Sequence, residues 1–196
     1  NSLFVTANGI RKPAKKQLTH YIQNALNYTS LRKSFYPEYF RKIGIKSCVY
    51  CNSQLTVTIH KQGSTIGARF EVDHHYPKSD FPFLSISLFN LYPCCASCNK
   101  RKSSIPINFF LYTDNPSKLS KSEYNFEITK ASECDYLVTK DAEGIEILFN
   151  DVSIPVTGHK SLQDVFSIKE IHDTQKDIIA ELIIKNQIYN ESFKNI

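Results

Sequence analysis

Two pairs of cysteines with the spacing Cys-x-x-Cys constrain this chain more than any other feature of its sequence. The first pair is Cys48 and Cys51, and the second is Cys95 and Cys98, with residues 52–94 between them. Two thiolates at this spacing bind one metal ion from a tight turn, and two such turns complete a tetrahedral zinc site. A redox motif does not require a second pair, and structural disulfides fit poorly in a reducing compartment. The sequence therefore predicts a structural Zn²⁺ that joins two distant segments around an inserted element.

The other two cysteines are less informative. Cys94 adjoins the second pair and offers an alternative Cys-x₃-Cys spacing with Cys98, although the two-residue spacing matches a zinc turn better. Cys134 lies in an apolar stretch, so we expect a small buried side chain there.

Composition favours a folded chain outside the membrane. The 196 residues are 41% hydrophobic, which suffices for a core in one domain or in a compact core with an appendage. No stretch of 18 apolar residues occurs, and the first thirty residues do not combine a charged segment with a following apolar one. We therefore expect a cytoplasmic protein without a membrane partner.

Charge is divided unevenly along the chain. Residues 1–42 contain eight Lys or Arg and one acid, residues 99–121 contain five and one, and residues 122–196 contain seven and fourteen. This division indicates a surface that faces nucleic acid, with Lys15 and Lys16 in its first block. Solvated charges that segregate without any ligand are the alternative interpretation.

Hydrophobic periodicity predicts a mixed α+β chain. Helices are expected over 14–28 and 34–43, where Gly44 ends the second one. A further helix is expected over 97–103, and the only plausible internal boundary is 105–121. The predicted strands are 55–59 with 68–72, then 91–93 after a loop over 73–90, and a hairpin of 136–139 with 145–149.

The C-terminal segment predicts one long helix. Ser167 and Glu170 have the spacing of a capping box, and apolar residues recur after it at helical spacing. Ile178, Leu182 and their neighbours form a wide apolar arc. Two interpretations stay open, because such an arc can pack on the rest of the chain or bind a partner protein.

Residues between and after the cysteine pairs carry the chemistry. Asp73 precedes His74, which sets a hard oxygen ligand beside a general base. Asn99 follows the last thiolate, and its amide oxygen is a candidate second ligand for a divalent cation opposite Asp73. The run Lys100, Arg101 and Lys102 is expected to crowd the start of a helix, where a phosphate would be held.

The order of these motifs resembles the HNH nuclease family. The matching pattern is Cys48-x-x-Cys51, then Asp73-His74-x-x-Pro77, then Asn90-Leu91, then Cys95-x-x-Cys98-Asn99-x-x-Lys102, and it covers roughly residues 44–106. The resemblance implies a two-stranded hairpin and a helix that grip one metal ion.

The resemblance also implies roles for single residues. His74 is then the general base, Asp73 and Asn99 are ligands of the catalytic cation, and Asn90 positions the base. Asn99 stands where many members have a second His, which favours Mg²⁺ over Zn²⁺ as the catalytic ion. Lys102, Arg101 and Lys100 are expected on neighbouring phosphates.

A longer run is similar to a narrower bacterial subgroup. Residues 73–79, 87–91 and 102–104 resemble the HNH subunits of retron and Septu-type antiphage systems, which work beside an ATPase partner. If the apolar arc around Ile178 and Leu182 binds a partner protein, this resemblance implies that the partner is the ATPase.

Together these observations predict three segments and one activity. Residues 1–43 form a basic helical segment, 44–106 an HNH-type ββα core held by the zinc site, and 107–196 an α/β extension with a hairpin and a long helix. The expected activity is metal-dependent cleavage of double-stranded DNA that leaves a 5′-phosphate and a 3′-hydroxyl. The alternative is a zinc-ribbon module that binds nucleic acid without cleaving it, although such a module has no need of Asp73, His74 and Asn99 together.

Overall fold

The structure is a computed structural model that describes residues 4–7, 10–60, 66–118 and 122–189. Its chain is mixed α and β and divides into two compact units. Unit 1 comprises residues 1–112 and 156–160, and unit 2 comprises residues 113–155 and 161–196. Unit 1 therefore contains both cysteine pairs and everything between them.

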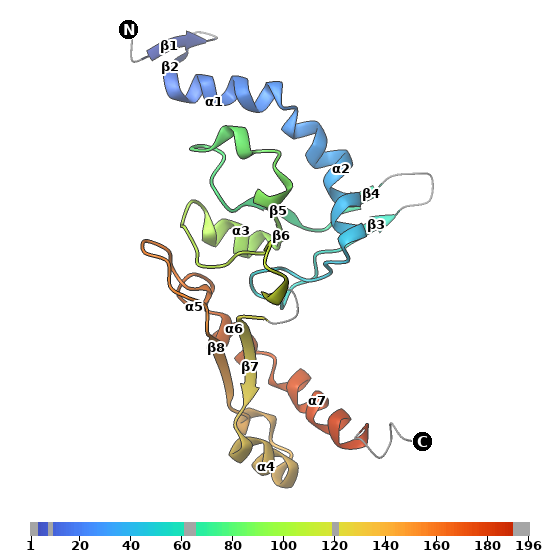
Figure 1. The fold of residues 1–196 in the computed structure, drawn as a ribbon. Helices are drawn as coiled ribbons and strands as arrows, with labels where there is room; N and C mark the ends of the chain where they lie inside the picture. The colour runs from blue at the N-terminus through green and yellow to red at the C-terminus, as the bar shows by residue number, and fades with distance from the viewer. Residues whose placement is uncertain (1–3, 8–9, 61–65, 119–121, 190–196) are drawn as a thin grey trace. The chain divides into compact units, whose positions relative to one another are not determined.

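Unit 1 begins with a hairpin and two helices (Figure 1). β1 (Phe4–Ala7) pairs antiparallel with β2 (Ile10–Pro13), and α1 (Ala14–Ala25) follows directly. The helix predicted over 14–28 ends early because Asn27 takes a left-handed φ of 53°, after which α2 (Tyr28–Ile43) begins. Gly44 ends α2 as predicted, with a φ of 83° that suits a residue without a side chain.

Two further antiparallel pairs follow in unit 1. β3 (Thr58–His60) pairs with β4 (Ile66–Ala68), and the turn between them lies outside the described residues. The predicted returning strand over 68–72 is divided, because β5 (Glu71–His74) leaves β4 to pair with β6 (Leu91–Cys94). The loop over 75–90 contains two 3₁₀ turns, Pro82–Leu84 and Leu88–Asn90.

α3 (Ala96–Lys102) follows β6 and packs on β5, so β5, β6 and α3 form a ββα arrangement (Figure 1). Both β6 and α3 lie within one residue of their predicted ranges. The other side of β5 faces an aromatic core in which Tyr28, Tyr36 and Phe40 of α2 pack with Val72 and Leu91.

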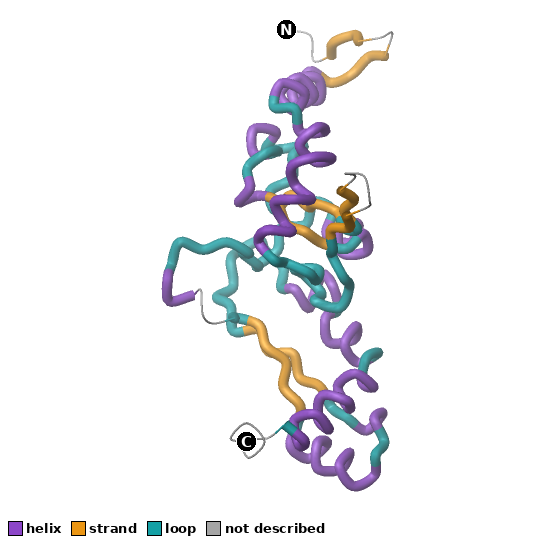
Figure 2. Tube along the Cα trace, turned by 90° about the vertical axis from the view of Figure 1, so that its right-hand side faces the viewer, coloured by secondary structure: helices purple, strands orange, loops and turns teal. Residues whose placement is uncertain are grey.

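Unit 2 contains a hairpin that differs from the predicted one. β7 (Tyr124–Ile128) pairs antiparallel with β8 (Ile147–Asp151), and the two strands lie side by side in both views (Figures 1 and 2). The segment 136–139, expected as a strand, belongs instead to α4 (Lys130–Thr139), which Thr129 caps by accepting from the Ser132 amide. Two short 3₁₀ turns, Pro116–Lys118 and Ala142–Gly144, complete the connections.

The long helix predicted from Ser167 onward is two helices, α6 (Ile168–Asp173) and α7 (Lys176–Ile188), and the short α5 (Leu162–Phe166) precedes them. Ser167 takes a left-handed φ of 54° and makes no cap hydrogen bond, so the predicted capping box is wrong. The box lies six residues earlier, between Ser161 and Asp164 at the start of α5.

α7 contributes to the core of unit 2. Ala180 and Ile183 are buried in a cluster with Tyr136, Ile145 and Ile147. Ile178 and Leu182, on the same helix, remain 50% and 58% exposed. Packing therefore accounts for part of the apolar arc. Among the described residues, every helix is too short or too polar to cross a membrane.

Candidate functional site

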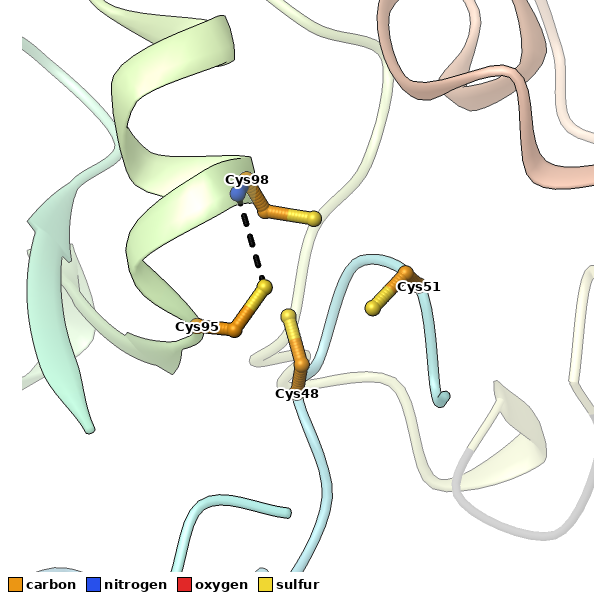
Figure 3. A group of neighbouring side chains, drawn as sticks. All are labelled: Cys48, Cys51, Cys95 and Cys98. Carbon is orange, nitrogen blue, oxygen red and sulfur yellow. Dashed lines mark hydrogen bonds between the residues drawn. The ribbon is translucent and has the colours of Figure 1, made fainter. Parts of the chain in front are cut away.

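The four paired cysteines converge at one point of unit 1. The sulfurs of Cys48, Cys51, Cys95 and Cys98 all lie within 4.8 Å of one another (Figure 3). Tetrahedral zinc with Zn–S bonds of about 2.3 Å separates its sulfurs by about 3.8 Å, so a small contraction is enough to ligate the ion. The donor set therefore fits Zn²⁺, and the prediction that these four cysteines lie together in a cluster that could hold a metal ion is confirmed.

Local backbone geometry sets up both cysteine turns. The Asn52 amide donates to the Cys48 carbonyl at 2.8 Å, and Asn52 has a left-handed φ of 50° that closes the first turn. In the second turn, the Cys98 amide donates to Cys95 Sγ at 3.4 Å, as the dashed line in Figure 3 shows. Hydrogen bonding with Cys48 lowers the pKa of the Cys51 thiol, which favours a thiolate in the cluster.

Cys94 and Cys134 lie outside the metal cluster. Cys94 is buried, its thiol donates to the Glu71 carbonyl at 3.8 Å, and burial raises its pKa far above that of an ordinary thiol. A neutral thiol engaged with the backbone is a poor zinc ligand, so the Cys-x-x-Cys spacing was the better prediction. Cys134 is exposed on α4, and the expectation that it is buried is wrong.

β5 directs Glu71 and Asp73 toward α3. Asp73 Oδ2 accepts from the Tyr50 hydroxyl at 2.6 Å and lies 3.0 Å from Lys102 Nζ. Burial raises the pKa of the Asp73 carboxyl, while the Lys102 ammonium and the Tyr50 hydroxyl act in the opposite direction. Asp73 is therefore the acceptor of a buried polar network.

Lys102 is completely buried, so its predicted role as a phosphate contact is wrong. Besides Asp73, its ammonium donates to the carbonyls of His74 at 3.0 Å and His75 at 3.3 Å. Lys100 and Arg101 are exposed, but they lie in the last turn of α3 and not at its start as expected. Lys15 and Lys16 lie in α1, and their side chains are outside the described part of the structure.

Asp73 and Asn99 do not form the predicted ligand set for a divalent cation. Asn99 donates from Nδ2 to the carboxylate of Glu71, and Asp73 is engaged with Lys102. A cation on Asp73 Oδ2 would face an ammonium 3.0 Å away, so Mg²⁺ does not fit the residues in this arrangement. Sequence reasoning assigned no role to Glu71, yet its position two residues before Asp73 in a strand places both carboxylates on one face.

His74 lies on the opposite face of β5 and is held by a backbone carbonyl. Its Nε2 is 3.0 Å from the Ser85 oxygen, and its ring centroid is 5.1 Å from that of Tyr28. A carbonyl only accepts hydrogen bonds, so Nε2 carries the proton. Burial first, and then the charges of Lys78, Lys102 and Arg32, lower the pKa of His74 to about 4, while the hydrogen bond to Ser85 acts in the opposite direction. The ring is thus neutral near pH 7, with Nδ1 as its basic nitrogen.

Asn90 braces the loop that carries Ser85. Its side chain accepts from the Tyr76 amide at 2.7 Å and donates to the carbonyls of Tyr76 at 3.1 Å and Leu84 at 3.2 Å. This geometry fixes both ends of the loop between β5 and β6, and with it the carbonyl that holds His74. Asn90 therefore acts on His74 through the loop.

His75 has a packing role. Its ring stacks on Tyr92 at a centroid distance of 5.2 Å and also lies against Tyr76 and Phe110. Burial lowers the pKa of His75 to about 4, and the nearby charge of Lys102 contributes to this shift as the second cause. The two adjacent histidines therefore have different surroundings although their pKa values are similar.

Comparison with known proteins gives no further assignment: no family model, curated protein or solved structure matches the chain.

Proposed function

We propose that this protein is an HNH-type, metal-dependent endonuclease that hydrolyses phosphodiester bonds of DNA. The observation that carries the proposal is the hydrogen bond between His74 Nε2 and the Ser85 carbonyl. A histidine whose one nitrogen is anchored to an acceptor presents the other, unprotonated nitrogen in a fixed direction. Such a histidine at the end of a strand, within a ββα unit beside a four-cysteine cluster, suits activation of a water molecule.

In this proposal His74 Nδ1 takes a proton from the attacking water. The low pKa keeps the imidazole neutral, so the basic nitrogen is available near pH 7. Ser85 stabilises the imidazolium that forms, because its carbonyl accepts from Nε2. Asn90 keeps this carbonyl in place through its bonds to Tyr76 and Leu84.

A divalent cation would supply stabilisation of the charge that develops on the phosphate. Glu71 and Asp73 are the carboxylates on the face of β5 next to α3, and Asn99 contacts Glu71. Lys102 neutralises Asp73 in this structure, so a cation at Asp73 would require the ammonium to move away from Oδ2.

Charge supports DNA as the substrate. Unit 1 contains sixteen Lys or Arg and four acids, whereas unit 2 contains eight and fifteen. The excess of twelve positive charges therefore lies in the unit that contains His74 and the cysteine cluster. Exposed Lys100 and Arg101 on α3 are candidate contacts to phosphates.

The test is cleavage of supercoiled plasmid by the purified full chain, with Mg²⁺ and with a chelator. We expect nicked and linear products with Mg²⁺ only, and none from His74→Ala. His60→Ala is the matched control, because His60 is exposed on β3. Equal cleavage by wild type and His74→Ala would exclude the proposed base.

A second candidate function is a zinc-ribbon module that binds nucleic acid without cleaving it. The buried network of Asp73, Tyr50 and Lys102 favours it, because this carboxylate is already satisfied by protein donors. This alternative predicts DNA binding by wild type and by His74→Ala alike, with no cleavage under either metal condition.

We also propose, from the resemblance to retron and Septu-type subunits, that the protein acts in antiphage defence beside an ATPase. The exposed side chains of Ile178 and Leu182 on α7 are the candidate contacts. Replacing both by Ser should abolish co-purification with the ATPase while leaving plasmid cleavage unchanged.

A further inference from the structure

Unit 1 contains a cavity on the side of β5 opposite Glu71 and Asp73. Its volume is about 510 Å³, within the range of pockets that bind small molecules. α1 contributes Gln23, the first turns of α2 contribute Arg32 and Lys33, and Phe70 and Lys78 lie on the remaining walls. The cavity is therefore formed by three segments that the fold brings together.

The charged groups that line this cavity are all basic. Arg32, Lys33 and Lys78 contribute guanidinium and ammonium groups, and among the described residues that line the cavity there is no Asp or Glu. None of the three forms an ion pair with any carboxylate of the described residues. Three cations around one concave site, without a neutralising carboxylate, leave a strong attraction for an anion.

Lys78 and the loop that carries it are held in place at the cavity. Lys78 Nζ lies 4.5 Å from the ring centroid of buried Tyr28. Burial lowers the pKa of Lys78, and the nearby positive charge of Arg32 lowers it as the second cause. Gln23 Nε2 donates to the Lys78 carbonyl at 3.0 Å, which fixes the loop against α1. Lys78 is thus held at the wall of the cavity and does not extend freely into solvent.

We propose that this cavity is a phosphate-binding site, occupied by a backbone phosphate of the bound nucleic acid. Arg32 offers the planar donor pair that phosphate oxygens accept, and Lys33 and Lys78 add point charges. The choice of nucleic acid as ligand rests on the proposed function. The presence of the site rests on the cavity itself. A nucleoside triphosphate offers the same chemistry and is the other source of phosphate.

The experiment measures binding by the full, zinc-containing chain without added Mg²⁺, so that cleavage plays no part. One arm titrates a fluorescent DNA duplex at several salt concentrations, and the other titrates a fluorescent ATP analogue with pyrophosphate as competitor. The variants are Arg32→Gln, Lys78→Gln and the double variant. Lys46→Gln is the matched control, because Lys46 is exposed in unit 1 and does not line the cavity. Zinc content and thermal unfolding verify that each variant is folded.

We expect the double variant to bind DNA at least tenfold more weakly, with the slope of log K against log salt reduced by about 2. Lys46→Gln should change both quantities less. If the variants instead lose pyrophosphate-sensitive ATP binding and keep DNA binding, the phosphate comes from a free nucleotide. If the double variant equals Lys46→Gln in both arms, the site does not exist. DNA binding through the cavity without plasmid cleavage would refute the nuclease and leave this site intact.

Discussion

At the scale of single residues, Lys102 and Asp73 form a buried ion pair inside the ββα unit. The ammonium of Lys102 is fully buried and lies 3.0 Å from Asp73 Oδ2. Lys102→Met should reduce the free energy of unfolding by about 3–5 kcal/mol, because it leaves a buried carboxylate without its partner. Urea unfolding monitored by tyrosine fluorescence measures this loss. Lys100→Met is the control, since Lys100 is exposed two residues earlier in α3. Equal stability of the two variants would contradict the buried pair.

Two buried histidines set the acid sensitivity of folding. Burial lowers the pKa of His74 and His75 from 6.5 to about 4, so the unfolded chain binds these protons more readily. This contribution to stability is therefore fully present above pH 6.5 and is lost as the pH falls towards 4, by about 3 kcal/mol for each histidine.

The matched variant for this pH dependence is His75→Phe, which keeps a ring on Tyr92 and removes a buried Nδ1 without a hydrogen-bond partner. Urea unfolding between pH 7 and pH 5 should show a shallower decline for this variant than for wild type. An unchanged decline would mean that His75 titrates normally. Exposed His60→Ala should leave the decline as it is in wild type.

At the scale of elements, the C-terminal helices depend on a cap that the sequence pattern misplaced. Ser161 accepts from the Asp164 amide at 3.1 Å, and Asp164 Oδ2 accepts from the Ser161 amide at 3.4 Å. Ser161→Ala should therefore cost about 1 kcal/mol in unfolding free energy. Ser167→Gly should be neutral or stabilising, because glycine tolerates the left-handed φ at this position. Chemical denaturation measures the unfolding free energy of both variants. A loss of stability in Ser167→Gly and none in Ser161→Ala would contradict this assignment.

The helices and strands that were predicted well are those whose ends are marked by residues close to them in the sequence. β6 and α3 were predicted well, because a short apolar run and the second cysteine turn fix their ends. The segment 136–139 was wrongly predicted as a strand because the alternating Tyr124, Phe126 and Ile128 were not recognised as β7, which is the strand that pairs with β8. Ser167 has a good capping sequence, but the packing of Phe166 and Ile168, both buried, requires a bend there.

At the scale of the whole molecule, zinc should hold unit 1 together. Cys48→Ser should lower bound zinc from about one ion per chain to near zero and unfold unit 1, because metal binding contributes much of the folding free energy at such sites. Elemental analysis and circular dichroism measure the two effects. Cys134→Ser is the control, since Cys134 is exposed on α4. Full zinc content in Cys48→Ser would show that Cys48 is no ligand.

The candidate site was predictable only where its residues are close in sequence. The cysteine turns and the adjacent Asp73 and His74 were recognisable from spacing. The partners of these residues come from distant segments: Tyr50 and Lys102 for Asp73, and Ser85 for His74. Such contacts depend on how β5, β6 and α3 pack, which hydrophobic pattern and spacing do not specify.

The most direct test of the account is single-turnover cleavage of an end-labelled DNA duplex by wild type and His74→Ala, with zinc content and DNA affinity measured on the same samples. The account predicts a rate lower by about 10²–10⁴ in the variant, because a positioned base is lost. It also predicts unchanged zinc and nearly unchanged affinity, since His74 is not a thiolate ligand and lies buried beside Ser85. Wild-type products should carry a 5′-phosphate and a 3′-hydroxyl. Equal cleavage rates for two folded, zinc-containing proteins would contradict the central claim.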